Sequence, residues 1–131
     1  MPDLPRDPID LGQAVVGLHR SGEACLVESP PGPPKRIDGL TIGAPFMTHE
    51  PPHVGEMHPD GDELLFLVSG GITVVLEDEE PARRVKLEPG QAIVVPRGVW
   101  HRVLIDEPSR MVHITPGPNG DHRPLPDADA G

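Results

Sequence analysis

The sequence predicts a single all-β domain, built as an antiparallel sandwich or barrel. Short apolar runs recur from residue 25 onward, and residues with turn chemistry separate them. The 19 prolines and 15 glycines leave little room for long helices. Short strands joined by short turns, without intervening helices, are typical of such a fold. The expected strands are Cys25–Glu28, Ile37–Phe46, Val54–His58, Glu63–Val68, Ile72–Glu77, Arg84–Leu87, Ala92–Val95, His101–Ile105 and Arg110–Thr115.

The two ends of the chain differ from this pattern. Residues 9–19 are expected to form one short helix, capped by Asp7 or Asp10, although its interior glycines weaken a helix. Residues 116–131 carry prolines, glycines and aspartates with almost no apolar content, which predicts a flexible tail. The expected division is an N-terminal helix or arm at 1–24, a β-barrel at 25–115 and a tail at 116–131.

Composition excludes several classes of function. The formal net charge of −10 disfavours nucleic acids and anionic membranes as partners, because both require clustered cations. No apolar run approaches the ~18 residues of a membrane span, and the start of the chain lacks the features of a signal peptide. The single Cys25 rules out an intrachain disulfide. We therefore expect a cytoplasmic protein.

A first cluster of ionisable residues surrounds a turn at residues 59–61. Glu56 and His58 share one face of a strand, because side chains alternate along it. A Pro-Asp-Gly turn is expected to reverse the chain and bring Glu63 within cross-strand reach of His58. Glu63 shares its face with the apolar Leu65, so it points into the barrel. An inward carboxylate is costly unless it is paired, protonated or bound to a cation.

A second cluster follows the buried run that begins at Gly90. A Pro-x-Gly corner at residues 96–98 leads to His101, which shares its strand face with Val103 and points inward. If the two clusters lie close together, the predicted metal ligands are Glu56, His58, Glu63 and His101. Two imidazoles with one or two carboxylates resemble a facial-triad site, which leaves coordination positions open.

These two segments resemble the two motifs of the cupin superfamily. In the first motif a histidine is followed after four residues by glutamate and after six more by glycine, as in His58, Glu63 and Gly70. In the second, glycine, a Pro-x-Gly corner and histidine have the spacing of Gly90, residues 96–98 and His101. The resemblance implies a cupin double-stranded β-helix, which is a jelly-roll-like barrel, here with a short N-terminal helix or arm.

The chain departs from the cupin pattern at Glu56, where the family has the first histidine of a His-x-His pair. Glu56 could bind the metal, transfer a proton as a catalytic base, or accept a hydrogen bond from a ligand. Asp62 is a weaker alternative to Glu63, since only Glu63 keeps the spacing to Gly70. His53 is a substitute ligand or base, and His113 is a candidate for the cavity wall.

The resemblance leaves two classes of function open. One is a metal-dependent enzyme, such as a dioxygenase, isomerase or lyase, acting on a small organic molecule. The alternative is a non-catalytic cupin that binds or senses a small ligand and keeps the metal site. Carboxylate-rich ligation favours Fe²⁺ or Mn²⁺, with Zn²⁺ and Ni²⁺ as alternatives. A homodimer is expected, because exposed sheet edges need covering.

Overall fold

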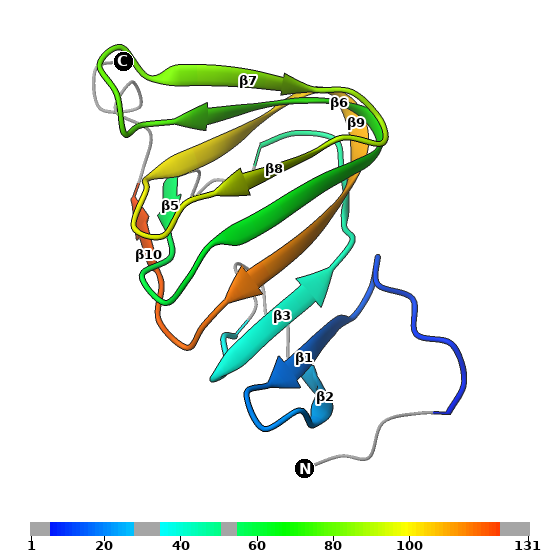
Figure 1. Ribbon diagram of the computed structural model, residues 1–131. Helices are drawn as coiled ribbons and strands as arrows, with labels where there is room; N and C mark the ends of the chain where they lie inside the picture. The colour runs from blue at the N-terminus through cyan, green and yellow to red at the C-terminus, as the bar shows by residue number, and fades with distance from the viewer. Residues whose placement is uncertain (1–5, 28–34, 51–54, 124–131) are drawn as a thin grey trace.

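The computed structural model describes residues 6–27, 35–50 and 55–123, and within these ranges the secondary structure is entirely β (Figure 1). The strands are β1 (Val15–His19), β2 (Ala24–Val27), β3 (Gly39–Gly43), β4 (Phe46–Met47), β5 (Gly55–Met57), β6 (Glu63–Leu76), β7 (Arg83–Leu87), β8 (Ala92–Val95), β9 (His101–Pro116) and β10 (Asp121–Arg123).

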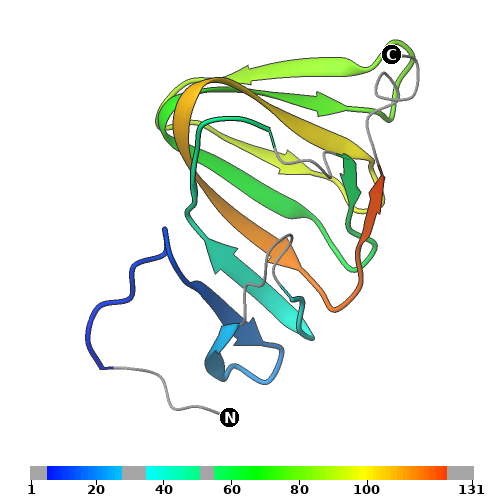
Figure 2. The ribbon, with the colours of Figure 1, turned by 180° about the vertical axis from the view of Figure 1, so that it is seen from behind.

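All pairings between these strands are antiparallel, and together they form two layers that share β6 and β9. The first layer contains β2, β1, β3, the second half of β9, the first half of β6, and β8. The second layer contains β7, the second half of β6, the first half of β9, β5 and β10. Figure 2 shows the two layers from behind. The all-β, antiparallel architecture expected from the sequence is confirmed.

The bend between the layers lies where β6 and β9 pass from one layer to the other. Their pairing shifts register between Leu67 and Ile72. Gly70 has a φ of +90° there, and a Cβ at this position would collide with Ser109. Ser109 is fully buried, and its Oγ accepts a hydrogen bond of 3.0 Å from the Gly71 amide. The breaks between expected strands at residues 69–71 and 106–109 are therefore bends within the continuous strands β6 and β9.

The core fills the space between the layers. Its side chains come from alternate positions of β6, with contributions from the neighbouring strands, as the period of a β-strand requires. The fully or nearly fully buried members are Leu65, Leu67, Ile72, Val74, Leu76, Leu87, Val95 and Met111. This apolar packing supports the polar residues that point into the same interior.

The helix expected at residues 9–19 is wrong, because the second half of this segment is strand β1. Gly12 and Gly17 disfavour a helix, and the β-branched Val15 and Val16 favour a strand. Gly17 also lies where a Cβ would collide with the side chain of Ile37, so the close approach requires glycine. β1 therefore pairs with β2 and β3 at the edge of the first layer.

The described residues also include a strand that was not expected. Strand β10 lies within residues 116–131 and pairs with β5. The proposed three-part division of the chain stays a prediction. In residues 6–27, 35–50 and 55–123, no helix has the length and apolarity needed to cross a membrane.

Candidate metal centre

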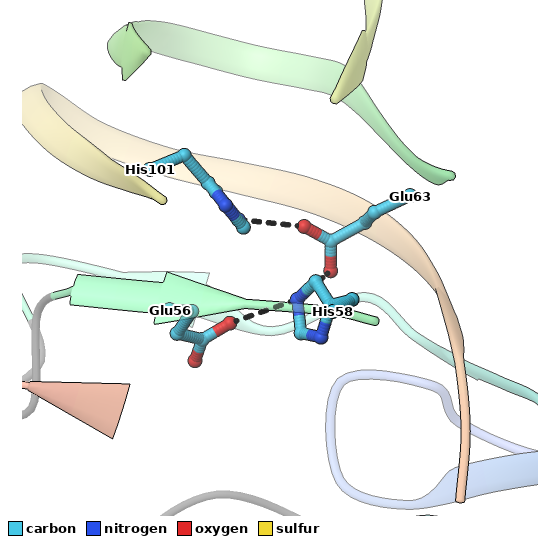
Figure 3. Close-up of side chains that lie close together, drawn as sticks. All are labelled: Glu56, His58, Glu63 and His101. Carbon is cyan, nitrogen blue, oxygen red and sulfur yellow. Dashed lines mark hydrogen bonds and ion pairs between the residues drawn. The ribbon is translucent and has the colours of Figure 1, made fainter. Parts of the chain in front are cut away.

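Four side chains from three parts of the chain meet between the two layers. Glu56 lies in β5, and His58 follows that strand directly, whereas Glu63 and His101 are the first residues of β6 and β9. Glu56 and His101 are cross-strand partners, which places both on one layer. Figure 3 shows all four side chains converging on a common space. The structure thus brings together the four residues predicted from the sequence.

The path that brings Glu63 to the site differs from the expected hairpin. Strand β5 pairs with β9 and β10, and no pairing joins it to β6 among the described residues. Residues 58–62 instead cross from the second layer to the first. The Gly98 amide donates a hydrogen bond of 3.0 Å to the carbonyl of His58 and holds this crossing in place. Glu63 therefore meets His58 across the barrel interior.

The contacts within the cluster are short. Nε2 of His101 lies 2.9 Å from Oε1 of Glu63, and Nδ1 of His101 donates to the Val99 carbonyl at 3.2 Å. The Val99 contact directs Nε2 toward the centre of the cluster, the orientation that outer hydrogen bonds commonly give to metal-ligating histidines. His58, Glu63 and His101 are each at most 3% exposed.

His58 is a buried imidazole whose ring nitrogens lack hydrogen-bond partners among the described residues. Its Nε2 lies 3.4 Å from Oε2 of Glu56 and 3.3 Å from Oε2 of Glu63, which are ion-pair distances. Neither contact has hydrogen-bond geometry, and among the described residues neither ring nitrogen has a hydrogen-bond partner. Leaving a buried polar group unsatisfied costs about 1 to 3 kcal/mol. A cation placed between the carboxylates and Nε2 would remove this deficit at that nitrogen.

The electrostatics of the cluster couple the acids to the imidazoles. Burial alone would raise the pKa of Glu63, but the hydrogen bond from His101 and the charges of His101 and His58 outweigh it and hold that pKa well below its usual range. Burial would lower the pKa of His58, yet Glu56 and Glu63 outweigh it and raise this pKa to about 9. The two carboxylates therefore favour the protonated form of His58.

Thr115 supports Glu63 from the neighbouring strand. The Thr115 hydroxyl donates to Oε2 of Glu63 at 2.7 Å, and Thr115 is fully buried. Nδ1 of His113 lies 2.9 Å from the same hydroxyl oxygen. Because the hydroxyl proton goes to the carboxylate, Nδ1 of His113 must be the donor in that second contact. Burial lowers the pKa of His113, and the nearby Arg36 charge acts in the same direction.

Thr115 was not singled out by the sequence, although it shares a strand face with His113 and the buried Met111. Polar residues at inward positions of an apolar strand were the available signal. His113 is half-buried, and it contacts the cluster through Thr115.

The remaining candidates lie elsewhere. Asp62 is exposed, and its Oδ1 accepts a hydrogen bond of 2.8 Å from the Arg97 amide, so it is not among the clustered donors. His53 lies outside the described residues.

The donor set fits a divalent ion. The four ligand atoms lie within 4.8 Å of one another. Two donors around an octahedral ion with bonds of ~2.1 Å are separated by roughly 3 to 4.2 Å. The most widely separated ligand atoms here would therefore have to approach each other by about 0.6 Å for all four to bind one ion. Two imidazoles and two carboxylates also match the N/O ligands of first-row metals. The cluster is therefore a candidate metal site.

Comparison with known proteins identifies the same region. A family model described as a cupin domain matches residues 46–115, just over half of the 131 residues. This range contains all four clustered residues and Thr115. A comparison with curated proteins gave no match.

Solved structures share the fold. A cupin-2 domain-containing protein from Shewanella frigidimarina has 22% identity and a TM-score of 0.51, over 63% of this chain and 74% of that chain. A Neisseria meningitidis protein has 20% identity and a TM-score of 0.51, over 70% of this chain and 81% of that chain. An oxalate oxidase has 15% identity and a TM-score of 0.53, over 70% of this chain and 54% of that chain. At these identities the likeness concerns the fold.

Proposed function

Since the chain belongs to the cupin domain family, we propose that it binds one divalent metal ion through Glu56, His58, Glu63 and His101. The observation that carries this proposal is His58, a buried imidazole without a hydrogen-bond partner among the described residues, facing two carboxylates. A bound cation satisfies all three groups at once. The ion would displace the proton that the carboxylates favour on His58, because a metal ligand must be neutral imidazole.

Fe²⁺ and Mn²⁺ are the favoured ions. Hard carboxylate oxygens make up half of the ligand set, and they suit these ions better than softer ones. Affinity alone follows a different order, so protein from a recombinant source can carry Zn²⁺ or Ni²⁺. The identity of the bound ion therefore has to be measured together with its exchange.

The better-supported role is a metal-dependent enzyme acting on a small organic molecule. Four protein donors leave open positions on a six-coordinate ion, which a substrate or dioxygen can occupy. Glu56 is the more accessible carboxylate, with 23% of its side chain exposed against 4% for Glu63. It can hold or move a proton, while Glu63 stays fixed. An oxalate oxidase and manganese-containing oxalate decarboxylase share this fold, which supports its capacity for such chemistry.

Metal analysis of protein purified without a histidine tag tests the proposed site. We expect about one ion per chain in the native protein and a large loss in His58→Ala and His101→Ala. His49→Ala is the matched control, because His49 is exposed and contacts Thr48 outside the cluster. Equal metal content in all four proteins would contradict the assignment.

A second experiment separates an enzyme from a binding module with a closed site. Fe²⁺-loaded protein is exposed to nitric oxide, and the electron paramagnetic resonance spectrum reports whether the gas coordinates to iron. An open position gives a new high-spin signal, whereas an ion saturated by protein ligands gives none. Absence of the signal from fully loaded protein would favour the non-catalytic alternative.

A further inference from the structure

A row of buried polar side chains crosses the inner face of the first layer, starting at the candidate metal centre. Glu63, Thr115 and Thr41 stand on the neighbouring strands β6, β9 and β3, and each is at most 3% exposed. The Thr115 hydroxyl donates to Oε2 of Glu63 at 2.7 Å, and the Thr41 hydroxyl donates to the Thr115 carbonyl at 3.4 Å. The row therefore connects the metal centre to a position two strands away.

Arg36 lies at the far end of this row. Its Nη1 donates a hydrogen bond of 3.2 Å to Oγ1 of Thr41, which is almost fully buried on the inner face. The guanidinium is therefore directed over the interior of the barrel, and Arg36 as a whole is half-buried. Burial lowers the pKa of His113, and the charge of Arg36 lowers it further, so the guanidinium also lies near this imidazole.

Close contacts with two glycines fix the segment that carries Arg36. A Cβ at Gly117 would lie 2.9 Å from Cβ of Arg36, and a Cβ at Gly17 would lie 2.6 Å from Cδ1 of Ile37. Gly17 belongs to the inner face, because it pairs with the inward-facing Thr41. Residues 36 and 37 thus pack closely against the first layer, and this packing sets the position of Arg36.

Arg36 forms no ion pair with a carboxylate among the described residues. The acceptor of its hydrogen bond is a neutral hydroxyl. Arg20 differs in this respect, because its Nε lies 3.0 Å from Oδ1 of Asp38 although its side chain is 74% exposed. Withdrawing a charge from water is costly unless the charge is paired. The exposed arginine is therefore paired, whereas the half-buried one lacks a counter-ion.

We propose that Arg36 binds a carboxylate group of the small molecule that occupies the open metal positions, so that this ligand is an organic acid. The inference rests on the proposed function, because the metal would hold the other end of the ligand. A divalent ion would offset the charges of Glu56 and Glu63, and Arg36 would then remain as an uncompensated cation. A carboxylate supplies the missing charge, and a planar guanidinium binds it through two parallel hydrogen bonds.

The length of the polar row limits the size of this acid. Neighbouring strands are ~4.8 Å apart, so Thr41 lies about 10 Å from Glu63. A metal–oxygen bond takes up ~2 Å of this span and a charged hydrogen bond ~3 Å, which leaves about 5 Å between the two ends of the ligand. Dicarboxylic acids of about four or five carbons have this length. The formal net charge of −10 repels anions from the chain as a whole, so their binding needs a local cation.

Isothermal titration calorimetry of Mn²⁺-loaded protein with succinate and with glutarate tests the proposal. We expect at least one of these acids to bind the native protein, and we expect Arg36→Gln to weaken that binding at least about 10-fold. Arg36→Lys keeps the charge without the paired donors, so its affinity should be intermediate. Arg20→Gln is the matched control, because Arg20 is exposed and already paired with Asp38. Its affinity should equal that of the native protein.

Two results would overturn the proposal: failure of both acids to bind the native Mn²⁺-loaded protein, and equal affinity in the native protein and Arg36→Gln. Metal content measured on the same samples separates these results from a failure of the metal site. NMR of the native metal-free protein decides the question if the protein retains no Mn²⁺ or if Arg36→Gln does not fold. A saturable shift of the Arg36 Nε–H signal with glutarate, absent at Arg20, would support the carboxylate site. No shift at Arg36 would overturn it.

Discussion

Replacing Thr115 by valine removes one hydroxyl from the support of the candidate metal centre and leaves the shape of the side chain almost unchanged. The hydroxyl donates to Oε2 of Glu63 at 2.7 Å, and both residues are at most 3% exposed. Water cannot replace the lost donor without opening the interior. Glu63 would then keep His101 and His58 as its neighbours but lose the contact that fixes its orientation.

The magnitude follows from the kind of bond that is lost. A hydrogen bond to a buried charged group contributes about 1.5 to 3 kcal/mol. Removing a residue that hydrogen-bonds to a metal ligand typically lowers metal affinity by about 10- to 100-fold, which corresponds to about 1.4 to 2.7 kcal/mol. We therefore expect the metal dissociation constant of Thr115→Val to rise within this range. The pKa of Glu63 should also rise, because a hydrogen bond to its ionised form has been removed.

The assay is competition for metal against a chromophoric chelator, with Mn²⁺ as the probe. Thr115→Ser is the matched control, since it keeps the hydroxyl and removes only a methyl group. Its affinity should lie close to that of the native protein. Urea unfolding of the metal-free proteins measures any general loss of stability separately. Equal metal affinity in Thr115→Val and Thr115→Ser would refute the positioning role, whatever their unfolding free energies.

Three other predictions concern the protonation of His58, the role of Glu56 as a metal ligand and the packing of Leu67 in the core. The pKa of His58 is raised from 6.5 to about 9, so its contribution to metal-free stability, about 3 kcal/mol, is fully present below pH 6.5 and is lost as pH rises through about 9. NMR titration of His58 checks this, and a midpoint at or below 6.5 would contradict it. If Glu56 is a ligand, Glu56→Gln should lose metal affinity, whereas Glu56→His should keep binding metal with a preference for softer ions. Metal affinity and selectivity that are unchanged in both variants would remove Glu56 from the ligand set. Leu67→Ala should cost about 2 to 5 kcal/mol of unfolding free energy because Leu67 is 0% exposed, and Val94→Ala should cost far less; similar losses in urea unfolding would show that the core is misassigned.

The sequence alone was sufficient for the fold class and for the members of the cluster. Strand alternation correctly placed Glu63 with Leu65 on an inward face, and both are nearly fully buried. The spacing around the Pro-x-Gly corner correctly placed His101 at the start of an inward-facing strand. These inferences depend on local periodicity and on short loops, which a sequence records directly. Metal binding by the four residues stays a prediction.

Other features depend on contacts between distant residues, and the sequence concealed them. The helix expected at residues 9–19 was wrong because its glycines and β-branched valines favour a strand, and the partners of that strand, β2 and β3, cannot be read from the segment itself. The hairpin expected between Glu56 and Glu63 was wrong, because residues 58–62 cross from the second layer to the first instead of connecting two paired strands. Thr115 was missed because its contact with Glu63 follows from the pairing of Leu64 with Ile114, fifty residues apart.

The sharing of β6 and β9 by both layers has a consequence for the motions of the barrel. In this two-stranded ribbon Leu64 pairs with Ile114 and Leu76 pairs with His101, so Glu63 and His101 belong to opposite ends of it. They come within 2.9 Å only because the ribbon curls back on itself. An ion bound by both residues would link the two ends of the ribbon and stabilise its curled form. Uncurling the ribbon would require releasing the ion, so slow hydrogen exchange at the bend and slow metal release should be governed by one opening event.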